Sequence, residues 1–102
     1  MPVYHIALFK LKSDADPIKV EKWKQQAHAM VGQVPGLLDL RADSPTEFTA
    51  PLAKGFDMAV VVLLDYLESL ATFFTHPSHH QVNILYQEVC DHKSTIAYDI
   101  EF

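Results

Sequence analysis

Three of the six histidines in this chain lie within five residues, as His76, His79 and His80. Pro77 stands between the first two, and its fixed φ and missing backbone N–H suit the first position of a helix. The residue before a proline is pushed out of the helical region, so His76 should be extended. We therefore predict that one helix ends near Thr75 and that another begins at Pro77.

His79 is the strongest candidate for acid–base chemistry. It would lie in the first turn of the new helix, where the helix dipole disfavours an imidazolium and leaves a neutral ring that accepts a proton. Residues placed at intervals of about 100° put His79 at the inward edge of the apolar face and turn His80 toward solvent. The alternative is that His79 only makes a structural hydrogen bond. For His76 we expect a structural role in the turn.

His5 is the second candidate. It alternates with Ala7 and Phe9 on one face of an expected strand, the face that we assign to the helices. If His5 and His79 meet between helices and sheet, they form a small polar site in an apolar pocket. The alternative is a buried core histidine with its hydrogen bonds satisfied.

Other chemistries fit the sequence less well. His76 and His79 have a spacing that suits a metal site, but no carboxylate or cysteine in the stretch supplies a converging third ligand. We therefore predict neither a metal nor another cofactor. Ser78 does not face His79, because adjacent helical residues point apart. Cys90 has no basic neighbour along the chain and should be an inert packing residue.

Composition narrows the class of protein. The chain has 102 residues, of which 49% are hydrophobic, and we treat residues 1–102 as one domain. A formal charge of −5 argues against a nucleic-acid partner, which needs a basic surface. A single cysteine fits a reducing compartment. Because no signal peptide and no membrane-length apolar run is visible, we expect a cytoplasmic protein with no membrane contact.

Periodicity divides the chain into seven elements. Asp16 should cap a helix that begins at Pro17 and ends near Gly32. Strands are expected over residues 3–12, 37–42, 56–64 and 95–102, and two further helices over 65–75 and 77–89. The order β-α-β-β-α-α-β predicts an α+β fold, a ferredoxin-like plait with an antiparallel four-stranded sheet whose second helix is broken at the proline.

Two local details complete these expectations. Asp65 and Glu68 have the spacing of a capping box for the helix over 65–75. The apolar face of that helix should be formed by Leu67, Leu70, Ala71 and Phe74. In the strand over 37–42, Leu38 and Leu40 should share one face.

The segment 59–64 is apolar without alternation, which is typical of a strand buried on both faces. One layer of helices covers only one face of a small sheet, so the other face needs a partner. Burial of a side chain such as Val61 contributes about 1.5–3 kcal/mol. We therefore predict a homodimer in which a second copy of the chain covers this face.

Residues 43–55 form a polar loop that carries Phe48 and Leu52. A loop of this length often carries function, so we expect it to fold back as a lid or as a wall at the entrance of the pocket.

Three motifs together resemble one family. They are V-Y-H-I-A-L-F-K-L-K from residue 3, G-F-D-M from residue 55 and F-x-x-H-P-S-H from residue 73. In this order and spacing they resemble the stress-responsive dimeric α+β barrel (Dabb) family, whose members include olivetolic acid cyclase and hydroxynitrile lyases of plants. The resemblance implies a homodimer in which two sheets face each other and form a barrel.

The resemblance also implies roles for particular residues. The histidine that matches His79 is the proposed general base of the cyclase, and His5 matches a characteristic histidine of the first strand. A tyrosine that assists the base is replaced here by Phe73, and a further pocket histidine is replaced by Met58.

Two functions follow from these observations. The first is an enzyme that abstracts a proton next to a carbonyl, with cyclisation or lyase cleavage, using His79 and His5 as catalytic residues. Its apolar substrate would contact Phe73, Phe74, Met58, Val82, Leu85 and Tyr86. The alternative, favoured by the missing hydroxyl at Phe73, is a non-catalytic homodimer that binds a hydrophobic small molecule.

Overall fold

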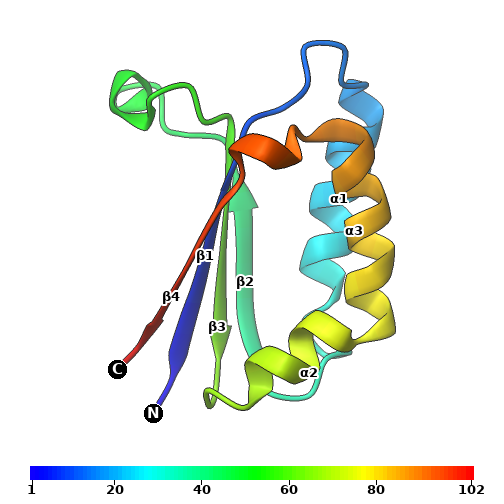
Figure 1. The fold of residues 1–102 in the computed structure, drawn as a ribbon, viewed down its shortest axis with the longest axis vertical. Coiled ribbons are helices and arrows are strands. Elements are labelled where there is room, and N and C mark those ends of the chain that lie inside the picture. The colour runs from blue at the N-terminus through cyan, green and yellow to red at the C-terminus, as the bar shows by residue number, and fades with distance from the viewer.

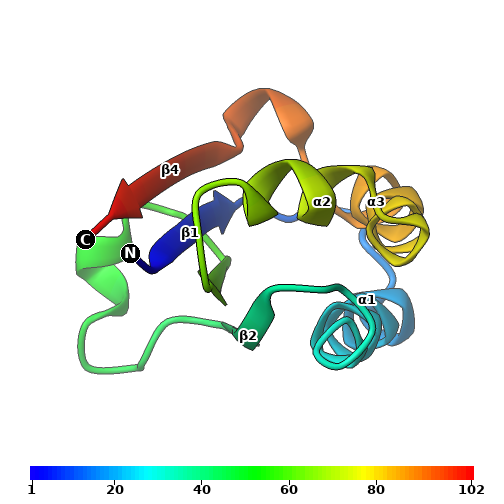
Figure 2. The ribbon, with the colours of Figure 1, turned by 90° about the horizontal axis from the view of Figure 1, so that it is seen from below.

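The computed structural model describes residues 1–102 as a four-stranded antiparallel sheet with three α-helices on one face (Figures 1 and 2). The strand order is β2-β3-β1-β4, and the ferredoxin-like α+β fold is confirmed. The strands are β1 (Val3–Phe9), β2 (Leu37–Asp43), β3 (Met58–Leu64) and β4 (Ile96–Glu101). The helices are α1 (Pro17–Ala29), α2 (Ser69–Thr75) and α3 (Pro77–Val89), with short 3₁₀ turns η1 (Ala50–Ala53) and η2 (His92–Ser94). None of the helices is long and apolar enough to cross a membrane.

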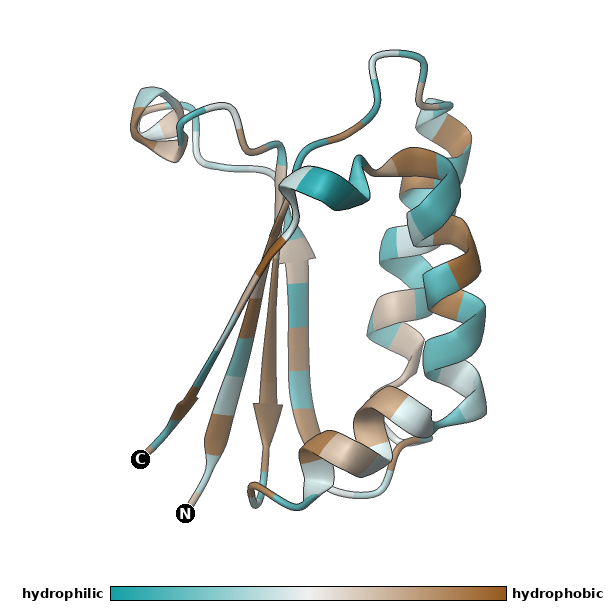
Figure 3. Ribbon diagram, viewed as in Figure 1, coloured by the Kyte–Doolittle hydropathy of each residue, from teal (hydrophilic) through white to brown (hydrophobic).

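The central strands β1 and β3 carry apolar residues on both faces, and in Figure 3 β3 is brown along its length whereas β1 alternates between brown and teal. In each strand, alternate residues point toward the helices and are buried, among them Val3 and Ala7 of β1 and Val62 of β3. The alternation holds because successive side chains of a strand point to opposite faces. His5 is therefore on the helix side of the sheet, as its spacing predicted.

Helix α1 begins as the sequence predicted. The Asp16 side chain accepts a hydrogen bond from the backbone N–H of Ile18 at 2.9 Å, and Pro17 occupies the first helical position. The helix buries Trp23 and Ala27 against the sheet. An apolar face anchored by one large aromatic residue thus fixes α1 to the core.

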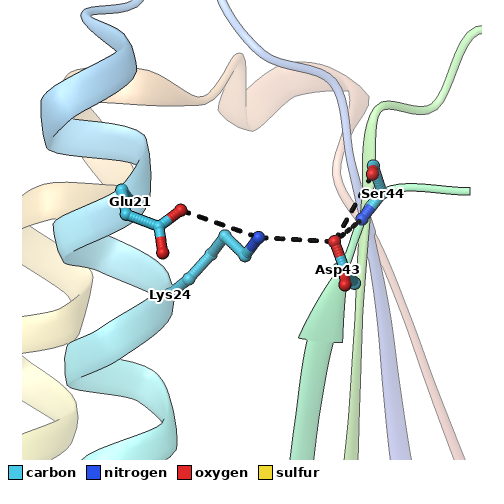
Figure 4. A network of polar contacts seen from close by, with 4 residues as sticks. All are labelled: Glu21, Lys24, Asp43 and Ser44. Carbon is cyan, nitrogen blue, oxygen red and sulfur yellow. Dashed lines mark hydrogen bonds and ion pairs between the residues drawn. The ribbon is translucent and has the colours of Figure 1, made fainter.

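A polar contact ties α1 to the end of β2 (Figure 4). The Lys24 ammonium lies 3.3 Å from the Asp43 carboxylate and 3.8 Å from that of Glu21. The backbone N–H of Ser44 donates to Asp43 and, together with Lys24, holds the pKa of this carboxyl below its usual value. Because Asp43 is exposed, the pair contributes little stability and mainly orients the strand end.

The predicted capping box is wrong. Glu68 is the N-cap of α2 but makes no side-chain capping bond. Asp65 instead accepts hydrogen bonds from the Ser69 hydroxyl and from the backbone N–H of Tyr66, so it holds the turn before the helix. The helix therefore starts later than its sequence pattern suggested.

The buried face of α2 differs from the predicted one for the same reason. Phe73 is 3% exposed, whereas Leu67 and Phe74 are 47% and 42% exposed. Since α2 begins at Ser69, Leu67 precedes the helix and cannot belong to its apolar face.

The faces of β2 also differ from the prediction. A register irregularity between Leu37 and Asp39 inserts an extra residue opposite β3. Leu38 is consequently 56% exposed, while Leu37 and Leu40 are buried on the helix side. A bulge of this kind shifts the alternation by one residue, and the sequence pattern alone did not show it.

The loop over 43–55 is not a lid over the helix side. It extends from the sheet on the side opposite to the helices (Figures 1 and 2), with Phe48 95% exposed and Leu52 75% exposed. On that same side the sheet presents an apolar face that no element of the chain covers. This outer face is defined by Tyr4, Ile6, Leu8, Ala59, Val61, Leu63, Ile96, Tyr98, Ile100 and Phe102.

Gly36 offers a test of the packing between β2 and α2. Its φ is +84°, and a Cβ at this position would lie 2.3 Å from the Ser69 hydroxyl oxygen. Gly32 has a similar φ of +91° with nothing within 4 Å, so it is the matched control. At either position a positive φ costs alanine about 1–2 kcal/mol.

Gly36→Ala should in addition break the bond from Ser69 to Asp65, which contributes about 1 kcal/mol. Thermal unfolding should therefore place the Tm of Gly36→Ala roughly 4 °C or more below that of Gly32→Ala. Equal melting temperatures for the two variants would contradict the close approach at Gly36.

Candidate functional site

A partly open cavity of about 180 Å³ lies between the sheet and the helices. Twelve of its sixteen lining residues are hydrophobic, so the polar groups stand out against apolar walls. Its floor includes the cross-strand pair Ala7 and Ala97, whose small side chains leave space above β1 and β4. The four polar lining residues are His5, His79, Asn83 and Thr95.

The junction between α2 and α3 places His79 at this cavity. His76 is extended, with φ −68° and ψ 141°, and caps α3 through its ring. Its Nδ1 accepts a hydrogen bond from the backbone N–H of Ser78 at 3.1 Å and lies 2.7 Å from the Ser78 hydroxyl. Because the His76 ring is held at the helix start, the structural role predicted for it is confirmed. His80 is exposed on the other side of α3.

Two phenylalanines join the two histidines of the cavity. The His79 ring centroid is 4.9 Å from that of Phe73 and 5.4 Å from that of Phe74. The His5 ring is 5.7 Å and 5.1 Å from the same two rings. The phenylalanines thus form an apolar wall that both imidazoles contact, and they limit the water around them.

The environment of His79 favours its neutral form. Burial lowers the pKa of the His79 imidazole, and the nearby His80 and His5 rings lower it further. The direction agrees with the sequence analysis, but the main cause is desolvation rather than the helix dipole. At neutral pH the ring is uncharged and carries one N–H donor and one nitrogen acceptor.

Asp99 is a residue that the sequence analysis did not single out. It lies opposite His5 in the pairing of β1 with β4, and its carboxylate is 2.6 Å from His5 Nδ1. A carboxylate can only accept, so Nδ1 carries a proton and donates it to Asp99, and in the neutral form of the ring Nε2 is then an acceptor. The strand register was the missing signal, because the sequence does not show which residues of two strands face each other.

The free nitrogen of His5 is accessible from the cavity. His5 is 6% exposed, and Nε2 makes no hydrogen bond within the chain. Since no buried side-chain nitrogen or oxygen lacks a partner, Nε2 must retain contact with the open space. His5 lines the cavity, which provides such an open space beside its ring.

The structure brings most of the predicted pocket residues together. Phe73, Phe74, Val82 and Tyr86 line the cavity with the two histidines. Met58 does not line it, because this residue pairs with Phe9 at the strand end and is buried in the core. Leu85 is likewise a core residue. The loop over 43–55 contributes no lining residue, so the wall expected from it is absent.

Other reactive groups do not converge. No three side chains of the His, Cys, Asp and Glu types are placed to hold a metal ion. Cys90 is fully buried, and burial together with the nearby Asp57 raises the pKa of its thiol to about 12. A thiol of this kind is unreactive at neutral pH, as the sequence analysis expected.

Comparison with known proteins places the chain in a family. Residues 3–102 match the Stress responsive A/B Barrel Domain (Dabb). The chain belongs to the Dabb family. A sequence comparison with the curated proteins found no match.

Solved structures share the Dabb fold at low identity. A dimeric ferredoxin-like protein of unknown function from Thermobifida fusca is 22% identical, with a TM-score of 0.83 over 100% of this chain and 92% of its own. A dimeric protein of unknown function from Bacteroides fragilis is 21% identical, with a TM-score of 0.82 over 99% and 96%. The hydroxynitrile lyase from Passiflora edulis is 14% identical, with a TM-score of 0.82 over 97% and 91%. At these identities the likeness shows the fold alone.

The lowered pKa of His79 predicts how stability changes with pH. A histidine whose pKa falls on folding binds fewer protons in the folded state than in the unfolded state. The free energy of unfolding therefore decreases as the pH drops below the ordinary imidazole pKa of about 6.5.

The variant His79→Gln should lose less stability than the wild type between about pH 7.5 and about pH 5, as measured by urea unfolding. His28→Gln, at an exposed position of α1, is the control and should keep the wild-type loss. A His79→Gln variant with the full wild-type loss would contradict the buried neutral state of this ring.

Proposed function

We propose that this Dabb protein is an enzyme that abstracts a proton next to a carbonyl of a mostly apolar small molecule. The observation that carries the proposal is the His5–Asp99 pair at 2.6 Å, whose free Nε2 lies in an apolar cavity beside a second, neutral imidazole. A carboxylate that holds one imidazole nitrogen is the arrangement of an oriented general base. Apolar walls suit a substrate with one acidic C–H or O–H.

His5 is the better proton acceptor of the two rings. When Nε2 takes a proton, the imidazolium that forms is stabilised by the Asp99 carboxylate on its other nitrogen. His79 has no carboxylate partner, so a charge on this ring would stay desolvated. The sequence pattern favoured His79 as the general base, whereas the Asp99 contact leads us to assign this role to His5.

His79 then stabilises the negative charge that develops on the substrate. In its neutral form it presents one N–H, which can donate to the carbonyl oxygen as the C–H bond breaks and an enolate forms. The enolate carbon can attack a second carbonyl of the same molecule, and the proton on His5 returns to the new alkoxide. The reaction class is an aldol cyclisation, which is also the class of the cyclase that the motifs resemble.

The same groups can perform the cleavage of a cyanohydrin. His5 Nε2 takes the hydroxyl proton, the C–CN bond breaks, and the products are a carbonyl compound and cyanide, which leaves with the proton. A hydroxynitrile lyase shares the fold, which supports this as the second reaction of the same site.

One observation favours a non-catalytic ligand-binding protein as the second candidate. Phe73 contacts both histidines but has no hydroxyl. The tyrosine that assists the base in olivetolic acid cyclase, whose motifs this chain resembles, is therefore missing. In that case the apolar cavity holds a hydrophobic small molecule without turning it over.

For the assembly we propose a homodimer in which the outer faces of two sheets pack together. The outer face holds large apolar side chains such as Tyr98 and Phe102, which are 64% and 53% exposed in the single chain. Apolar faces of this size mark an interaction surface. Two solved structures with this fold are described as dimeric, which supports a homodimer.

The catalytic proposal can be tested with two simple substrates. Exchange of the α-protons of 4-phenylbutan-2-one in D₂O, followed by NMR, reports proton abstraction, and benzaldehyde release from mandelonitrile reports cleavage. The wild type should accelerate at least one of them. His5→Ala and Asp99→Asn should each lower the rate about 10²-fold, since general base catalysis typically contributes 10²–10⁴-fold.

His28→Ala, at an exposed position that does not line the cavity, is the control and should keep the wild-type rate. A folded His5→Ala variant with the wild-type rate would show that His5 is not the base. If the wild type binds the ketone but accelerates neither reaction, the protein is the non-catalytic binder.

If the outer face is the dimer interface, one charged residue introduced into this face should disrupt the dimer. Tyr98, on the outer face of β4, is 64% exposed in the single chain and pairs with Ile6 of β1. Tyr98→Asp should shift the protein from dimer to monomer in sedimentation at micromolar concentration, because the carboxylate would be buried in the dimer among apolar side chains. Ile18→Asp, at an exposed position of α1, is the matched control and should remain dimeric. A monomeric wild type would overturn the assembly.

A further inference from the structure

The cavity has a second polar end that the proton-transfer proposal does not use. The Tyr86 hydroxyl lies 2.7 Å from the Thr95 hydroxyl, and both residues line the cavity. Tyr86 is held in place by rings of the core, with its centroid 5.5 Å from that of Phe9 and 6.5 Å from that of Trp23. The hydroxyl is thus fixed at a defined position in a wall where most lining residues are apolar and Asn83 is the other polar lining residue of α3 beside His79.

This hydroxyl pair is distant from the histidines. Tyr86 follows His79 by seven residues on α3, so their Cα atoms lie roughly 10 Å apart along the helix axis at about 1.5 Å per residue. Thr95 comes directly before Ile96, which pairs with Leu8, whereas Asp99 pairs with His5. The floor between the two ends is the Ala7–Ala97 pair. Two independent elements, α3 and β4, therefore place the hydroxyls and the imidazoles at opposite ends of one mostly apolar cavity.

The pair can serve a ligand either as donor or as acceptor. The Thr95 hydroxyl has a second, weaker partner in the Asp91 carbonyl oxygen at 3.4 Å. If Thr95 donates to Asp91, Tyr86 donates to Thr95 and keeps its lone pairs free for a ligand donor. If Thr95 donates to Tyr86, the phenol O–H is free to donate to a ligand acceptor. In each state the Tyr86 oxygen keeps the capacity for one further hydrogen bond.

We propose that Tyr86 and Thr95 form a second polar subsite, which selects ligands that carry an oxygen function at each end of an apolar body. The carbonyl with its acidic C–H lies at His5 and His79, and a hydroxyl at the other end of the ligand bonds to the pair. A hydroxyaryl ketone fits this description, and a plain alkyl or aryl ketone leaves the subsite unused. The inference rests on the proposed function, because it requires that the cavity binds a ketone.

A matched ligand pair tests the subsite. The probes are 4-(4-hydroxyphenyl)butan-2-one and 4-phenylbutan-2-one, which differ by one hydroxyl, with dissociation constants measured by calorimetry. Trp23, the single tryptophan, lines the cavity and gives a second readout by fluorescence. The wild type should bind the hydroxylated ketone about five- to tenfold more tightly, as one net hydrogen bond allows.

Tyr86→Phe and Thr95→Val should each reduce this ratio to less than about twofold, because each removes one hydroxyl of the pair. Tyr66→Phe, an exposed tyrosine outside the cavity, is the matched control and should keep the wild-type ratio. The ratio compares two ligands on one variant, so a small loss of stability does not change it.

The outcomes separate the two proposals. Equal binding of both ketones by the wild type, or an unchanged ratio in both variants, would overturn the subsite and leave the proposed function intact. Binding of neither ketone by the folded wild type would overturn the proposed function and the subsite with it.

Discussion

The break between α2 and α3 is the constraint on which the rest of the site depends. Pro77 cannot continue a helix, and His76 turns extended and caps the next helix with its own ring. Phe73 and Phe74 end one helix while His79 begins the other, so three rings from two helices meet at one point. Without the break, a continuous helix would carry His79 past the sheet instead of presenting it to His5.

The cavity exists because small side chains are placed where large ones would fill the space. Ala7 and Ala97 pair across β1 and β4, and Ala27 of α1 faces the same space. Around them the walls are aromatic and aliphatic, so the polar groups at each end act in a medium of low polarity. Desolvation is accordingly the first cause of the lowered pKa of His79. The same desolvation makes the carboxylate partner of His5 important for any proton transfer.

The sequence predicted the fold well because its signals are local. The prolines mark the starts of α1 and α3, and alternation in β1 assigns His5 to the helix side. The sequence-based prediction was wrong where contacts between residues distant in the chain determine the local structure. The bulge that exposes Leu38 depends on pairing with β3, and the bond between Asp65 and Ser69 replaces the expected capping box. The direction of the loop over 43–55 depends on which face of the sheet is free.

Residue types and spacing by themselves determined the order of the elements, the two histidines and the aromatic wall beside them. Hydrophobic periodicity and the backbone limits of proline act over a few residues, so they can be read without coordinates. Only the tertiary structure decided that Asp99 holds His5, that Met58 lies outside the cavity and that Tyr86 meets Thr95. Each of these depends on strand register or on the spacing between helix and sheet. Both are determined by contacts between residues that are distant in the chain.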